Sequence, residues 1–101
     1  MSIKVTVLIK KESKVDPRTT NTDFYATLSL LNEGGEEYGH GPRFFSGYDE
    51  VAGLLKREAG VGHQQLQDFK PVYERGETVR LRLTVENDEA IQNLGFGPEA
   101  T

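Results

Sequence analysis

Three segments of the sequence alternate apolar and polar side chains at every second residue: residues 3–10, 24–31 and 78–86. A period of two is that of a β-strand with one buried face and one solvated face. Strands of this kind are typical of antiparallel sheets that are covered on one side only. The alternation therefore predicts a sheet with an apolar face under helices and an opposite, polar face that is open to solvent.

Two helices are predicted to cover the apolar face. An apolar stripe predicts a main helix from about Tyr48 to Ala59, with Ser46 as its N-cap and Gly60 as the residue that ends it. A second, short helix from Asp88 to Leu94 begins with acidic residues, which suit the positive end of a helix dipole. The inward positions of these strands and helices give the following expected core: Val5, Val7, Phe24, Ala26, Leu28, Leu30, Val51, Leu54, Leu55, Leu81, Leu83 and Ile91.

The remaining segments are predicted to be connections, short strands and a tail. Residues 11–23 are polar and without a period, which indicates a long, mobile connection. Short strands are expected within residues 43–46 and 71–77, the second leading into a turn at Arg75-Gly76. The tail, residues 96–101, contains Gly97-Pro98 and is expected to fray.

Together these elements predict one α+β domain over residues 1–101. It is a two-layer sandwich whose mainly antiparallel sheet has about four to five strands, with the main helix and the short C-terminal helix on one face. A length of 101 residues, of which 36% are apolar, agrees with one small domain around a single core. Because such a domain has little room for a deep active-site cavity, we expect its function to lie on the surface.

The composition removes several classes of function. The chain has no cysteine, which excludes disulfides, zinc–thiolate and iron–sulfur sites and thiol nucleophiles. The longest apolar run is Val7 to Ile9, far short of the roughly 20 residues of a membrane-spanning helix, and no signal peptide is recognisable, so we expect a cytoplasmic protein. The net charge of −4 is shared evenly between the two halves of the chain and disfavours non-specific binding to duplex nucleic acid.

Few residues are candidates for catalysis or metal binding. His40 and His63 lack the spacing that would place two metal ligands on one face, so exposed loop histidines are favoured over a metal site with Glu36 and Glu37. No serine lies in a nucleophile motif, and Ser46 is better explained as a helix cap. We therefore expect a protein that is not an enzyme and that holds no metal or cofactor.

The leading hypothesis rests on an aromatic group near the start of the main helix. Phe44, Phe45 and Tyr48 follow a glycine-rich segment. Aromatic side chains are enriched at protein interfaces, although the same residues could pack in the core under the helix. This group predicts a non-catalytic domain that acts by contact with a protein partner or with a second copy of itself, as a homodimer.

The alternative hypothesis uses the polar face of the sheet. If the three long strands are neighbours, Lys4, Tyr25, Arg80 and Arg82 share that face with several threonines. Cationic and aromatic side chains on an open sheet can hold single-stranded nucleic acid. The acidic net charge and the single aromatic residue argue against this function, and a metal-binding or small-ligand protein is the third alternative.

The order of these elements along the chain is similar to that of the small antitoxin domains of the HicB class, on the segments Ile3–Ile9, Phe24–Leu30, Arg43–Phe45, Tyr48–Ala59 and Val79–Val85. The chain has a long connection at residues 11–23 where that class has a tight turn, and it lacks the Pro-Gly-Cys-like turn before the helix. The resemblance implies binding of another macromolecule and transfers no individual site residue. For the alternative hypothesis, the corresponding role is that of an antitoxin-like or regulatory nucleic-acid-binding module.

Overall fold

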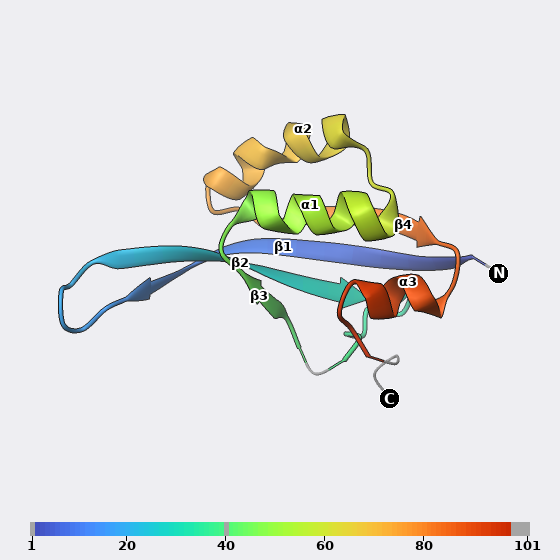
Figure 1. Cartoon of the computed structure of the whole chain (residues 1–101), viewed down its shortest axis with the longest axis horizontal. Coiled ribbons are helices and arrows are strands. Elements are labelled where there is room, and N and C mark those ends of the chain that lie inside the picture. The colour runs from blue at the N-terminus through green and yellow to red at the C-terminus, as the bar shows by residue number, and fades with distance from the viewer. Residues whose placement is uncertain (1, 40, 98–101) are drawn as a thin grey trace.

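A computed structural model describes residues 2–39 and 41–97. In chain order its elements are β1 (Ile3–Val15), β2 (Thr22–Leu31), β3 (Arg43–Phe45), α1 (Tyr48–Ala59), α2 (His63–Glu74), β4 (Val79–Val85) and α3 (Asp88–Asn93) (Figure 1). The four strands form one sheet in the order β3-β2-β1-β4, and every neighbouring pair is antiparallel. The predicted α+β class is confirmed with four strands. A turn follows β2, closed by a hydrogen bond from Gly35 N–H to Asn32 O, 3.0 Å, and the described residues after it add an isolated bridge between Leu31 and Glu37.

The core lies between the sheet and the helices. Figure 1 shows α1 and α2 side by side along the sheet, and α1 contacts β1, β2 and β3 while α2 contacts β1 and β4. The alternate positions Val7, Ala26 and Leu28 are fully buried, as predicted. The core prediction was wrong for Phe24, which is 58% exposed, and Leu83 is partly buried and packs against the core.

The predicted connection at residues 11–23 is instead the far end of a long hairpin, which we call the arm (residues 11–23). Strand β1 runs on to Val15 and β2 starts at Thr22, with these two residues paired. The turn is closed by backbone bonds from Asp16 N–H to Asn21 O, 2.9 Å, and from Thr20 N–H to Asp16 O, 2.8 Å. Figure 1 shows the arm projecting beyond the helices, which explains the exposure of Phe24. Beyond Lys11 both faces of the arm meet solvent. Because neither face is buried there, the sequence does not have to alternate apolar and polar residues.

Helix α1 has the predicted bounds but a different N-terminal cap. Its N-cap is Gly47, and the expected side-chain bond from Ser46 is not made. Instead, the Glu50 carboxylate reaches back and accepts hydrogen bonds from both the hydroxyl and the backbone N–H of Ser46. These two bonds, with a smaller contribution from the charge of Arg43, hold the pKa of Glu50 below its ordinary value. Gly60 ends the helix with φ +66°, as predicted.

Helix α2 was not predicted. Residues 61–70 show no clear period and residues 71–77 suggested a strand, yet a helix runs across both segments and contains Pro71 in its last turn. Leu66 and Tyr73 anchor it in the core. The buried Tyr48 hydroxyl donates a hydrogen bond to Leu66 O, and the Tyr48 and Tyr73 rings lie 5.1 Å apart. One hydrogen bond and one ring contact, both made by Tyr48 of α1, thus hold a segment whose own sequence pattern is weak.

The C-terminal segment is anchored through Phe96. Asn87 caps the predicted short helix by accepting from Ala90 N–H at 3.3 Å, and Phe96 is buried with its N–H bonded to Ile91 O. The predicted fraying is therefore wrong at Phe96, and residues 98–101 lie outside the described residues. Arg43 Nη1 donates to Leu94 O at 2.7 Å, which ties β3 to the end of α3.

A side chain at Gly95 is expected to break this attachment. Gly95 has φ +96°, and a Cβ there would lie 2.5 Å from Cζ and 2.7 Å from Cδ of Arg43. Gly95→Ala should therefore lower the free energy of unfolding by about 2–3 kcal/mol, from backbone strain and the displaced hydrogen bond. Urea denaturation measures the change. In an Arg43→Ala background the same substitution should cost less, and an equal cost in both backgrounds would contradict this account.

Alkaline pH is expected to weaken the contact between α1 and α2. Burial, reinforced by the charge of Asp49, raises the pKa of Tyr48 to about 12 from an ordinary value of 10.0. The folded state therefore holds this proton where the unfolded chain releases it, so its stabilising contribution is complete below pH 10 and declines as the pH rises toward 12.

Comparison with Tyr48→Phe isolates this contribution. The variant should be less stable by about 1 kcal/mol at pH 8, because it lacks the hydroxyl that donates to Leu66 O. Its stability should also fall less steeply than that of the wild type between pH 10 and 12. Urea denaturation at pH 8, 10 and 11 gives both slopes, and parallel slopes would rule out Tyr48 as the source.

Candidate functional site: the outer face of the sheet

The sheet face opposite the core is built from alternate residues of all four strands. We define the outer face by its twelve side chains: Lys4, Thr6, Leu8 and Lys10 of β1, Tyr25, Thr27, Ser29 and Leu31 of β2, Phe44 of β3, and Arg80, Arg82 and Thr84 of β4. The pairing register sets these side chains in rows across the strands. One row is Phe44, Thr27 and Lys10, and the next is Ser29, Leu8 and Arg80. The exposure of Lys4, Arg80, Arg82 and Phe44 shows that this face is open.

Four cations lie on the β1 and β4 part of the outer face. They are Lys4, Lys10, Arg80 and Arg82, and none of the twelve positions holds an acidic residue. The rest of the chain then carries eight Lys or Arg against sixteen Asp or Glu. The protein as a whole is acidic, but its charge is segregated, with positive charge concentrated on the open sheet face.

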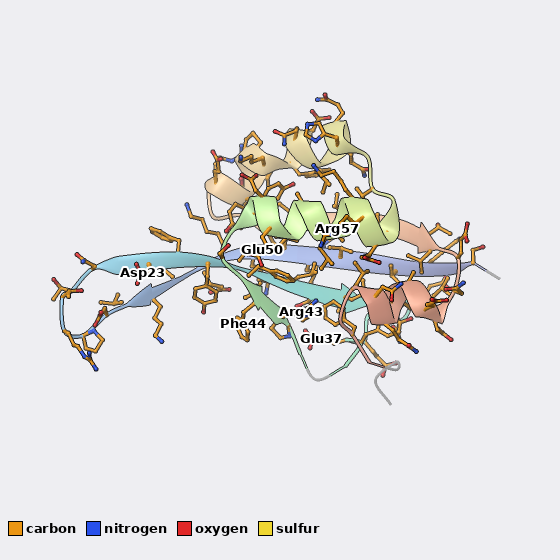
Figure 2. All side chains as sticks on the ribbon, in the orientation of Figure 1. Asp23, Glu37, Arg43, Phe44, Glu50 and Arg57 are labelled. Carbon is orange, nitrogen blue, oxygen red and sulfur yellow. The ribbon has the colours of Figure 1, made fainter. Side chains whose placement is uncertain are left out.

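Two aromatic rings lie at the β3 side of the same face. The centroids of Tyr25 and Phe44 are 5.8 Å apart, and the ring planes are inclined by 52°. Phe44 is 67% exposed, and Figure 2 shows it projecting from β3 on the side away from α1. Thr27, which lies between Phe44 and Lys10 in the register, is buried beneath these longer side chains. The rings thus present a stacking surface next to the cations.

A shallow hollow of about 490 Å³ lies at the end of the outer face that is farthest from the arm. Lys4, Thr6, Arg82 and Thr84 line it together with Glu33 from the turn after β2. At the arm end the bordering residue is Glu12, which is paired with Tyr25. The face is therefore bordered by the Glu12 carboxylate at the arm end and by the Glu33 and Glu37 carboxylates at the other end, where Glu37 is bridged to Leu31.

The structure separates the residues of the predicted partner surface. Phe45 and Tyr48 are buried in the core, at 9% and 3% exposure, so they cannot act as exposed anchors. Phe44 alone of that group presents its ring to solvent, and it does so on the outer face. The reason is the strand period, which turns Phe44 and Phe45 to opposite sides of β3.

The four residues predicted for nucleic acid all lie on the outer face. Lys4, Arg80 and Arg82 are grouped on β1 and β4. Tyr25 is distant from Lys4, because its partner on β1 is eight residues further along that strand, about 26 Å. The alternation in the sequence places Lys10 on this face, but the predicted set of binding residues left it out. The ring contact between Phe44 and Tyr25 was missed, because it depends on the register of β3 on β2.

The predicted alternative of a metal site at the histidines finds no support in the described residues. His63 is exposed at the start of α2, with its Nδ1 3.1 Å from Lys56 Nζ, and His40 lies outside the described residues. Within residues 2–39 and 41–97, no three His, Cys, Asp or Glu side chains are grouped as metal ligands. No helix in the same part of the chain is long and apolar enough to cross a membrane.

Comparison with known proteins finds no matching family model, no similar curated protein and no similar solved structure. The outer face, with its cations and its aromatic pair, is therefore the feature from which a function can be inferred.

Proposed function

We propose that this protein is a non-catalytic binding domain whose outer face binds single-stranded nucleic acid. The observation that carries the proposal is the placement of four cations and an aromatic pair, with Phe44 exposed, on one open face of an otherwise acidic molecule. Two features of the sequence disfavoured this function: the acidic net charge and the single aromatic residue predicted on the face. In the structure, positive charge is concentrated on the outer face although the whole protein is acidic, and Phe44 adds a second ring in contact with Tyr25.

The two kinds of side chain have complementary roles in such binding. Lys and Arg side chains neutralise phosphates and release counterions, while aromatic rings stack on unpaired bases. Phe44 is separated from Lys10 by one strand, which is about 10 Å across the sheet. An oligonucleotide lying across the strands can therefore place a base on the aromatic pair and its phosphates over the cations. A duplex keeps its bases stacked inside and cannot use the rings in this way.

Fluorescence anisotropy with labelled single-stranded oligonucleotides of about 12 nucleotides tests the proposal. With about four phosphate contacts, the logarithm of the binding constant should fall against the logarithm of salt concentration with a slope near −3. A duplex of the same length and an uncharged polymer serve as comparison ligands. No binding at 50 mM salt, or equal binding of single strand and duplex, would overturn the proposal.

A protein partner is the second candidate, and it is favoured by a different part of the molecule. Val15 on the arm and Phe24 directly after it are 57% and 58% exposed, and both lie outside the outer face. Exposed apolar side chains on a projecting hairpin are typical of protein contacts. This surface is independent of the proposed nucleic-acid site.

A further inference from the structure

One edge of the arm is free to pair with another strand. Strand β1 runs from Ile3 to Val15, but β4 pairs only with its residues Ile3–Ile9. From Lys11 to Val15, the described residues place no strand on that edge, while β2 occupies the other. An edge with unpaired backbone N–H and C=O groups is a template for a further strand.

The sequence of this edge is complementary to itself in an antiparallel arrangement. When two copies pair about a two-fold axis at Ser13, Glu12 of each copy lies opposite Lys14 of the other. The same register sets Lys11 opposite Val15 of the second copy. Directly opposite residues point to the same side of a sheet, so both copies keep their helices on the same side.

Neighbouring registers that also keep the helices of both copies on the same side of the sheet are disfavoured by charge. A shift that centres the pairing on Glu12 sets Glu12 against Glu12 and Lys10 against Lys14. A shift that centres it on Lys14 sets Lys14 against Lys14 and Glu12 against Asp16. Like charges directly opposite each other are destabilising in a sheet. Of these three registers, the Ser13-centred one alone places residues of opposite charge directly across from each other.

We infer that the arm is a self-association device in which the β1 edges of two copies pair antiparallel about Ser13. The exposed Val15 then lies beside the partly buried Lys11 of the second copy, whose Nζ lies 4.7 Å from the centroid of its own Phe24 ring. Five paired residues bury less area than a permanent dimer interface, so the dimer forms at high protein concentration and dissociates on dilution.

Single-cysteine variants test the register, since the chain has no other cysteine. At the two-fold axis, the two Ser13 Cα atoms would lie about 4.5–5.5 Å apart, which a disulfide can span. The two Val15 residues, on the same face and two residues along, would lie about 14 Å apart. Under mild oxidation, Ser13→Cys should form a disulfide-linked dimer at least tenfold faster than Val15→Cys. Equal rates, or no cross-linking by Ser13→Cys, would overturn the inference.

Charge reversal gives a second, non-covalent test. Glu12→Lys and Lys14→Glu each create like-charge pairs in their own dimers, so each should raise the dimer dissociation constant at least tenfold in analytical ultracentrifugation. An equimolar mixture restores both opposite-charge pairs and should recover association, with far-UV circular dichroism confirming that both variants are folded. A mixture that associates no better than its components would contradict the proposed pairing.

Discussion

Arg80→Glu with Arg82→Glu is expected to reduce the affinity for a single-stranded oligonucleotide at least about 100-fold at 50 mM salt. The pair contributes two of the four cations of the outer face, and their reversal places two carboxylates against phosphates. Both side chains are exposed, so the free energy of unfolding should change by less than about 1 kcal/mol. Anisotropy titrations at several salt concentrations measure the loss in affinity and the expected shallower salt dependence.

The matched control reverses two charges on the helical side of the molecule. Lys56→Glu with Arg57→Glu changes the net charge by the same amount and also affects exposed side chains, on α1. If net charge alone determined binding, the two double variants would lose the same affinity. Binding at the outer face requires the β4 variant to lose at least tenfold more. Equal losses of affinity in the two double variants would contradict the assignment of the binding site to the outer face.

The strands were predictable where one face meets the core and the other meets water. Val7 and Ile9 on β1, and Leu81 on β4, are buried at the predicted alternate positions. The same β1 strand continues through Lys11–Val15, where the contact with the helices ends at Lys11, whose Nζ donates a hydrogen bond to Glu74 O at the end of α2. The arm is held by backbone pairing with β2, and this interaction leaves no hydrophobic period in the sequence. The sequence therefore indicated a loop where the structure has strands.

The candidate site was only partly predictable for a related reason. The alternation of side-chain direction along each strand placed Lys4, Arg80, Arg82 and Tyr25 on the polar face, because it can be read from the local sequence of that strand. The contact between Tyr25 and Phe44 depends on which strands are neighbours and in which register, and this information is not local. Net charge was misleading for another reason: it sums over the molecule, whereas a ligand meets the charge of one face.

Helix α2 illustrates a segment whose structure depends on tertiary contacts. In its mostly polar sequence, Leu66 and Tyr73 are the buried residues, and Pro71 lacks the N–H that a helix interior uses. Local propensity alone therefore gives little reason for a helix there. The buried contacts of α2 with α1, β1 and β4 must provide most of its stability.

Leu66→Ala should accordingly destabilise the whole domain. Leu66 is fully buried, so its truncation leaves a cavity and should lower the free energy of unfolding by about 3 kcal/mol, or about 15 °C in Tm. The exposed neighbour Gln65→Ala is the control and should change stability by less than about 0.5 kcal/mol. Thermal and urea denaturation measure both variants. A loss below about 1 kcal/mol for Leu66→Ala would mean that α2 contributes little to the core, and that the sheet and α1 hold the fold without it.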